Sequence, residues 1–483
     1  LPIIAREPHP AGSPAQAGVR DYLVQQLSAI GLETEVQQAG RIENVVARLH
    51  GSEPTGAIVV LAHYDSVAAG PGAADNGSGV AALLEIMRAL ASGPAPRNDV
   101  IALFDDSEER GPYAGTRAFV LGHPWMADVR VAISLDTAVR GPISTNETGP
   151  NNGWLVQALA RAYTGGAWTS ASGGGGYDYT PFREAGIQGL ALEDNYPFKE
   201  QHTAQDIPEI VSAASVQQMG EQTLSITREL GKLDLSNPYA EQETYFSVSG
   251  LGLVHYPEAW AVPLAISASV LLVIAFGLAL WRGFATWRGL VVALLAILVT
   301  SGLAGLGINA LWAGVPDLMG WETSSWAEWP EVIPPYGWLV VAAFALLILG
   351  LAIVGYKLAR HWSARSDYSL VGMALFLIPA VALAIGIPRA SYVPVWSVLI
   401  GSLCWIAAVA AGRKRMAWSV DMGTVLAALP LVVLFLPFLP GVVMGDGMKS
   451  LAILAAAWAL LLGVVLPAID GLLVRTPDAQ GLP

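Results

Sequence analysis

The chain of 483 residues is longer than an ordinary single domain, and its residue types are distributed unevenly along it. Its net charge of −13 argues against nucleic acid as a partner, because binding to phosphates needs clustered lysine and arginine. The only cysteine, Cys404, excludes an intrachain disulfide and a multi-cysteine zinc site, and it argues against a cysteine nucleophile.

The two halves of the chain differ in composition. Residues 1–233 mix charged, polar and apolar side chains, whereas residues 259–470 are dominated by Leu, Ala, Val, Ile and Trp. The positive mean hydropathy of +0.49 comes from this second half. We therefore predict a soluble domain over 1–233, a linker over 234–258, a transmembrane domain over 259–470 and a tail over 471–483. Since the chain starts at Leu1 without a signal-peptide pattern, we expect an anchor or signal to precede it.

Helices and strands are expected to alternate in the first half. Ser13-Pro14-Ala15-Gln16 is typical of a capping box, and it predicts a first helix that ends near Gly31. Further helices are expected at 80–90, 115–121, 152–163 and 207–230. Strands are expected at 33–37, 44–49, 57–61, 100–104, 129–135 and around 189–192. This alternation predicts an α/β fold, a mixed sheet flanked by helices, with its site along one sheet edge.

The stretch after the buried strand 57–61 carries the first chemical signal. His63 and Asp65 lie two residues apart, so their side chains leave the same face of the strand. That geometry suits a metal-bound imidazole with a nearby carboxylate that fixes its tautomer or the metal shell. Asp75 follows on a loop with glycines on both sides, where the backbone can approach an ion closely.

Other metal-capable side chains follow the other buried strands. The full set in the first half is His63, Asp75, Glu108, Glu109, Asp136 and His202. Two imidazoles with several carboxylates form a ligand set that zinc accepts. A site for two ions about 3.5–4 Å apart needs one carboxylate that spans them. If three carboxylates bind the ions, one of the Glu108–Glu109 pair is left over, and it is suited to act as a general base.

The first 230 residues resemble the M28 family of zinc metallopeptidases. The motifs that match, in order, are His63-Tyr64-Asp65, Gly72-Ala73-Ala74-Asp75-Asn76, Glu108-Glu109-Arg110-Gly111, Ser134-Leu135-Asp136 and His202-Thr203-Ala204-Gln205-Asp206. The resemblance implies two zinc ions per chain that are bridged by Asp75. It implies that His63 and Asp136 complete one zinc site, and that Glu109 and His202 complete the other.

The same resemblance implies the remaining roles and the activity. Glu108 would be the general base, Asp65 would hold His63, and the peptide bond between Asp75 and Asn76 would be cis. Asp136 is similar to the residue found in aminopeptidase members. The expected activity is therefore that of an exopeptidase, an aminopeptidase that hydrolyses peptide bonds with a bridging metal-bound water.

Several nearby residues have plainer interpretations. Asp206 is expected to cap a helix and not to bind metal. Tyr177 and Tyr179 are interpreted as loop packing, and stabilisation of an oxyanion is the second possibility for them. The Gly173–Gly176 run lacks the strand–loop–lysine pattern of a phosphate site, and it is interpreted as a loop.

Seven apolar runs in the second half approach the length of about 20 residues that a bilayer span requires. They lie at about 260–281, 289–312, 336–356, 369–387, 391–412, 422–443 and 450–469. Alternate loops are basic, through Arg282, Arg288, Lys357, Arg360, Arg365, Arg413, Lys414 and Arg415. The intervening loops are acidic or nearly neutral, apart from Arg389. By the positive-inside rule, the first half faces the non-cytoplasmic side, which is the periplasm, the lumen or the exterior.

This architecture resembles the membrane-embedded branch of the M28 family that includes the endoplasmic reticulum metallopeptidase. The expected partners are a peptide substrate and the lipid bilayer, and nothing in the sequence specifies an oligomeric state. The spans hold few ionisable residues, so we favour an anchor and partner-binding platform over a transporter. Two rival functions stay open for the first half, a single-zinc acyl transferase like glutaminyl cyclase and a non-catalytic receptor or scaffold.

Overall fold

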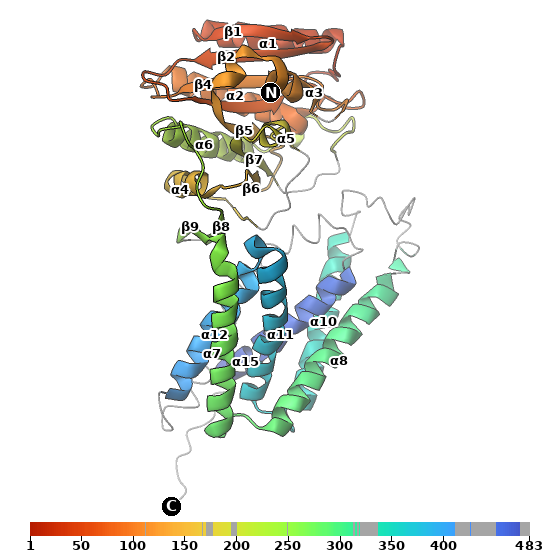
Figure 1. Cartoon of the computed structure of the whole chain (residues 1–483). Helices are drawn as coiled ribbons and strands as arrows, with labels where there is room; N and C mark the ends of the chain where they lie inside the picture. Colours follow the sequence, from red (N-terminus) through yellow and green to blue (C-terminus); the bar gives the residue numbers. More distant parts are fainter. Residues whose placement is uncertain are drawn as a thin grey trace, which may run out of the picture. The chain divides into compact units, whose positions relative to one another are not determined.

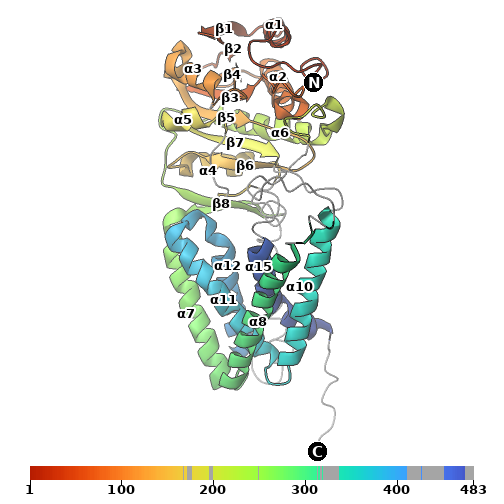
Figure 2. The ribbon, with the colours of Figure 1, turned by 90° about the vertical axis from the view of Figure 1, so that its right-hand side faces the viewer.

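The computed structural model describes residues 1–111, 113–166, 168–170, 177–194, 200–248, 250–312, 337–410 and 451–473, with 314, 315, 318 and 426. The chain divides into two compact units, Leu1–Glu258 and Ala259–Pro483. Figure 1 and Figure 2 show the elements of both units.

A seven-stranded mixed sheet forms the centre of the first unit. Its strands are β1 (Glu33–Ala39), β2 (Ile42–Leu49), β3 (Ala57–His63), β4 (Asp99–Asp105), β5 (Val129–Leu135), β6 (Ile143–Thr148) and β7 (Gln188–Asp194). They lie in the order β1-β2-β4-β3-β5-β7-β6. The pairs β4–β3, β3–β5 and β5–β7 are parallel, and the outer pairs are antiparallel. The predicted fold class is confirmed.

Helices cover both faces of this sheet. They are α1 (Pro14–Ala29), α2 (Ser78–Ala91), α3 (Ala114–Gly122), α4 (Gly153–Ala162), α5 (Thr180–Glu184) and α6 (Ala213–Leu230). Figure 2 shows α3 and α5 to the left of the strands, and α2 and α6 to their right. Ile58 and Val60 pack in one core cluster with residues of α1, α2, α4 and α6, while Val59 and Leu61 pack in another with residues of α3 and α5. The strands are therefore apolar on both faces, as the continuous apolar runs predicted.

Serine side chains cap the first turns of α1 and α6, and the predicted start of α6 needs a correction. The Ser13 hydroxyl accepts a hydrogen bond from the Gln16 backbone N–H at the start of α1, as predicted. The closing helix was predicted from residue 207, but α6 starts at Ala213. The short turn η3 (Pro208–Ile210) precedes it, and the Ser212 hydroxyl caps α6 by accepting from Ser215 N–H.

Two small elements were not predicted. The edge strand β6 carries mostly polar residues, so it lacks the hydrophobic pattern by which a strand is recognised. Helix α5 has only five residues, which is too short for a helical period to be read.

A hairpin ends the first unit. Strands β8 (Glu243–Val248) and β9 (Gly252–Pro257) pair antiparallel within the segment predicted as a linker, 234–258. The backbone of the buried Tyr245 bonds to Ser170 at two points. Ser170 N–H donates to the Tyr245 carbonyl, and Tyr245 N–H donates to the Ser170 hydroxyl. The hairpin therefore packs as a part of the first unit.

Long apolar helices make up the second unit. They are α7 (Ala261–Trp281), α8 (Trp287–Trp312), α10 (Gly337–Ala359), α11 (Arg365–Gly386), α12 (Tyr392–Ala410) and α15 (Leu451–Leu473). Among the described residues, five stretches are long and apolar enough to cross a bilayer, namely Glu258–Trp281, Trp287–Leu311, Ala342–Ala359, Arg365–Gly386 and Tyr392–Ala410. In α15 a shorter apolar stretch, Ala457–Asp470, is found. The span expected at 422–443 lies outside the described residues, apart from Leu426.

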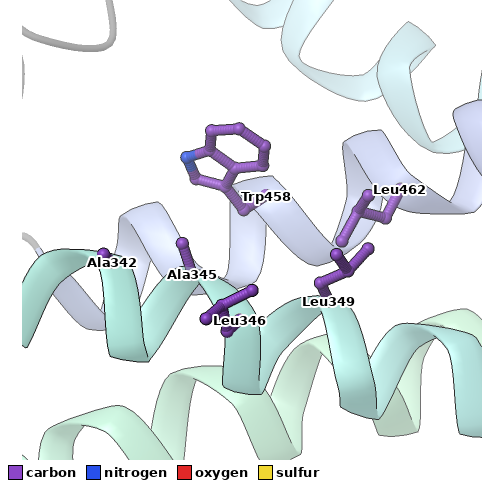
Figure 3. A pocket seen from close by; sticks show the side chains of 6 residues that line it. All are labelled: Ala342, Ala345, Leu346, Leu349, Trp458 and Leu462. Carbon is purple, nitrogen blue, oxygen red and sulfur yellow. The ribbon is translucent and has the colours of Figure 1, made fainter.

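The surface of these helices is apolar as well as their interior. Val273 is 70% exposed and Leu306 is 73% exposed. Large apolar side chains in such positions are stable when lipid surrounds them. An apolar pocket lies between α10 and α15 (Figure 3). It is lined by Ala342, Ala345, Leu346, Leu349, Trp458 and Leu462.

Candidate metal centre

The predicted site residues gather at one edge of the sheet in the first unit. His63 is the last residue of β3, Asp136 directly follows β5, and Glu108 and Glu109 follow β4 by three and four residues. These strands are mutually parallel, so their carboxyl ends meet at the same edge. His202 comes from the loop after β7.

Asp75 lies between the two histidines. His63 Nε2 is 3.2 Å from Asp75 Oδ1, and His202 Nε2 is 3.2 Å from Asp75 Oδ2. His202 Nε2 is also 3.3 Å from Glu109 Oε2. Two groups of three could each hold a metal ion, with ligand atoms within 4.8 Å of one another: His63, Asp75 and Asp136, and Asp75, Glu109 and His202. All five expected ligands therefore come together, and the two groups share Asp75.

The loop that carries Asp75 needs glycine at a fixed point. Gly72 has φ +63, and a Cβ there would lie 2.6 Å from the Asp75 carbonyl oxygen. The short turn η1 (Ala73–Gly77) follows, and its Asp75–Asn76 peptide bond is cis, as the resemblance implied. The Asn76 side chain donates to the Leu135 carbonyl at 2.8 Å, which ties this loop to the end of β5.

Asp65 supports both His63 and the acidic pair. The His63 Nδ1 atom lies 3.2 Å from the Asp65 carbonyl oxygen and 3.5 Å from Asp65 Oδ1. The Asp65 carboxylate accepts hydrogen bonds from the backbone N–H groups of Glu108 at 3.1 Å and Glu109 at 3.4 Å. This one side chain therefore fixes the backbone of both glutamates in addition to facing the imidazole.

Several buried carboxyl groups lie close together in this cluster, and both burial and proximity shift their pKa values. Burial, reinforced by the charge of Asp75, raises the pKa of Glu109 to about 8 and that of Asp136 to about 7. Burial also raises the pKa of Glu108. For Asp75, burial opposes ionisation, but hydrogen bonds from His202 and His63 outweigh it and lower the pKa. Carboxylates crowded in this way are stabilised by a bound cation.

The residues present fit a divalent metal. Glu109 Oε1 is buried without a hydrogen-bond partner, although the same carboxylate contacts His202 through Oε2. Such a lone buried oxygen is explained by a ligand bond to an ion. Imidazole nitrogens with carboxylate oxygens, and no thiolate, are donors that zinc accepts.

Asp206 takes a different role from the one expected. It was expected to cap a nearby helix, but η3 has no side-chain cap. Its carboxylate instead accepts hydrogen bonds from the backbone N–H groups of Ala74 at 2.7 Å and Asp75 at 3.2 Å. It thereby ties the His202 loop to the Asp75 loop. In the sequence, Asp206 stood out only because it belongs to the His202 motif. Its hydrogen-bond partners could not be inferred, because they lie 131 and 132 residues away.

We predict that Asp206→Asn weakens zinc binding about 10- to 100-fold, the usual cost of losing a group that orients a metal ligand. Asparagine offers one acceptor oxygen where two backbone N–H groups need one each. The measurement is zinc affinity by competition with a chelator. Asp234→Asn, at an exposed carboxylate that accepts from Ser236 N–H, is the matched control. Equal zinc affinity in the variant and the control would rule out the positioning role of Asp206.

Three further residues near the site are now placed. Gln201 Nε2 donates to Asp75 Oδ2 at 3.0 Å, a contact that the sequence did not indicate. Tyr179 is buried in the core and donates to the Ile187 carbonyl, so the packing interpretation holds for it. Tyr177 donates to Glu193 Oε1 at 2.7 Å. The Gly173–Gly176 run lies outside the described residues.

The first unit is therefore an α/β domain with a candidate metal site where its parallel strands end. Residues 44–227 match the model of Peptidase family M28. The first half of this chain therefore contains a domain of Peptidase family M28, as the motifs indicated.

The chain is similar to two kinds of curated membrane-associated relative. It is 31% identical over 240 residues to endoplasmic reticulum metallopeptidase 1 of Rattus norvegicus, which is 45% of this chain and 26% of that protein. It is 32% identical over 231 residues to the vacuolar membrane protease of Candida dubliniensis, which is 43% of this chain and 25% of that protein. The chain thus matches about a quarter of the length of these relatives.

Solved structures are more distant in sequence. An aminopeptidase from Aneurinibacillus sp. strain AM-1 matches at 14% identity with a TM-score of 0.41. The match covers 46% of this chain and 90% of that aminopeptidase.

Proposed function

We propose that this protein is a membrane-anchored, zinc-dependent exopeptidase, most simply an aminopeptidase, that hydrolyses peptide bonds outside the cytoplasm. The observation that supports this proposal best is the position of Asp75. Its two carboxylate oxygens face different histidines, and it belongs to both metal-capable groups. One carboxylate that serves two metal positions is typical of co-catalytic metallohydrolases.

The ligand assignment follows these two groups. Asp75 would bridge two zinc ions, with His63 and Asp136 on one ion and Glu109 and His202 on the other. Bound zinc would supply Lewis-acid polarisation of the scissile carbonyl and would make water a stronger acid.

A side chain of the protein would transfer the proton of the attacking water. Glu108 belongs to neither metal-capable group, and it lies beside Glu109 with its backbone N–H bound to Asp65. Its carboxylate would take a proton from the attacking water and deliver it to the leaving amine, which is the work of a general base followed by a general acid. Burial raises its pKa, which helps it to hold that proton between the two transfers.

The second unit would hold the enzyme in a bilayer. Arg282 and Arg288 lie around the connection of α7 to α8, and Lys357, Arg360 and Arg365 lie around that of α10 to α11. The positive-inside rule places these basic connections in the cytoplasm. The peptidase domain, which precedes α7, would then face the lumen, periplasm or exterior. The relatives named for the endoplasmic reticulum and the vacuolar membrane agree with a membrane enzyme.

Metal analysis with a matched substrate set tests the proposal. We expect the full chain, purified in detergent, to carry two zinc ions and to hydrolyse aminoacyl anilides but not their N-acetylated forms. Exposure to a chelator should abolish turnover, and added zinc should restore it. One zinc ion per chain with cyclisation of N-terminal glutamine would favour the acyl transferase. A chain loaded with zinc that hydrolyses no peptide would favour the receptor or scaffold.

A further inference from the structure

A glutamate that has no place in the proposed metal centre lies beside it. Glu193 is the second-last residue of β7, and Leu192 pairs with Leu135 in the parallel β5–β7 register. The Asp136 N–H donates to the Leu192 carbonyl at 2.9 Å and extends the pairing by one residue. Glu193 and Asp136 are therefore neighbours across two strands, on the same face of the sheet.

The surroundings of Glu193 fix its carboxyl group. Glu193 is half-buried, whereas the other six residues of β7 are buried. Tyr177 donates to Glu193 Oε1 at 2.7 Å. The next residue, Asp194, holds the strand end in place, because its Oδ2 accepts from three successive backbone N–H groups at 139–141. The backbone at Glu193 is therefore held in place by hydrogen bonds, and the residue is partly exposed to solvent.

The charge balance around Glu193 indicates what it could bind. Burial, reinforced by the negative charge of Asp136, raises the pKa of Glu193 to about 8. Among the described residues, Glu193 is in neither metal-capable group. Once metal ions balance the ligating carboxylates, a cation from the substrate beside Glu193 would stabilise the ionised form of its carboxyl group.

We infer that Glu193, oriented by Tyr177, is a specificity-determining residue that binds a primary ammonium group of the peptide substrate beside Asp136. This inference rests on the proposed peptidase function and deepens it. A peptide offers this chemistry from two sources, its free α-amino group and a lysine side chain.

The test compares the wild-type chain with Glu193→Gln on three anilides. Leucyl anilide carries the α-amino group alone, lysyl anilide carries both ammonium groups, and 4-methylpentanoyl anilide carries neither. Loss of a hydrogen bond to a charged group costs about 10- to 100-fold in binding. We expect KM for leucyl anilide to rise by about that factor in Glu193→Gln, with kcat within a few-fold and zinc content unchanged.

Two further variants sharpen the result. Tyr177→Phe should raise KM in the same direction by a smaller factor, because it removes one hydrogen bond to Glu193 and keeps the carboxyl group. Glu184→Gln, at an exposed carboxylate that pairs with Arg117, is the matched control and should leave KM unchanged. Butylamine should inhibit the wild type more strongly than the Glu193→Gln variant, while butanol should inhibit both equally.

The outcomes separate the sources and the hypotheses. A KM increase for leucyl anilide assigns the α-amino group, and an increase for lysyl anilide alone assigns the lysine side chain. Equal KM values for the wild type and Glu193→Gln on both substrates would overturn the inference and leave the proposed function standing. A zinc-loaded wild type that hydrolyses none of the three anilides would contradict the proposed function itself, and the inference with it.

Discussion

Replacing Glu108 by glutamine is expected to lower kcat for peptide hydrolysis by about 10²- to 10⁴-fold, the range that general acid–base catalysis contributes. Glutamine has nearly the same shape as glutamate, but its amide does not accept the proton of the attacking water. Zinc binding should persist, because Glu108 belongs to neither metal-capable group. The backbone should also persist, because Asp65 accepts from the Glu108 N–H and not from its side chain.

The measurement pairs kcat with zinc content for the same purified sample. Glu85→Gln is the matched control, since Glu85 is 66% exposed on α2 and pairs with Arg88 on its own helix. A Glu108→Gln variant that turns over at the wild-type rate would remove Glu108 from the mechanism. A variant that loses zinc would instead make Glu108 a ligand and leave the general base to be found elsewhere.

Asp75→Asn is expected to abolish zinc binding and to lower activity by about 10³-fold or more, because metal catalysis supplies several kcal/mol of the barrier reduction. Each Asp75 oxygen lies 3.2 Å from a different histidine nitrogen. Asparagine keeps one neutral oxygen and turns an amide N–H₂ group toward the other position, so both metal positions lose charge or a ligand.

The readout is zinc content together with the zinc dependence of Tm. A ligand that binds only the folded state stabilises it by RT ln(1 + [L]/Kd), so the wild-type Tm should rise with zinc and that of Asp75→Asn should not. Asp21→Asn, at a surface carboxylate that pairs with Arg20, is the control. If Asp75→Asn keeps one tightly bound zinc and most of its activity, Asp75 does not bridge two ions.

Most residues of the candidate metal site could be predicted from the sequence. The candidate ligands end a buried apolar strand or follow one, namely His63, Asp75, Asp136 and Glu109. The carboxyl ends of parallel strands meet at one edge of the sheet. The residue types at those ends then limit the chemistry, because imidazoles and carboxylates without thiolates suit zinc. The positions of the apolar helices were equally accessible, since a bilayer span is recognised by its length and composition alone.

Contacts between distant segments could not be predicted in the same way. The pairing of Asp206 with the N–H groups of Ala74 and Asp75 joins loops that are remote in sequence. Strand β6 was missed because its polar residues carry no period, and it forms because β7 offers an open edge. Both depend on which segments the sheet order brings together, and local patterns do not encode that order.

The sequence by itself determined that an α/β domain carries imidazole and carboxylate groups at its strand ends and that apolar helices of bilayer length follow it. Only the tertiary structure decided how those groups are shared and supported. In the folded chain Asp75 lies between both histidines, and the Asp65 carboxylate accepts hydrogen bonds from the backbone of both glutamates. Glu193 lies next to Asp136 on the neighbouring strand. The physical reason is that residue type and hydrophobic periodicity are local properties of the chain. Which side chains share a ligand position, and which strands are neighbours, depends on contacts between segments that are distant in sequence.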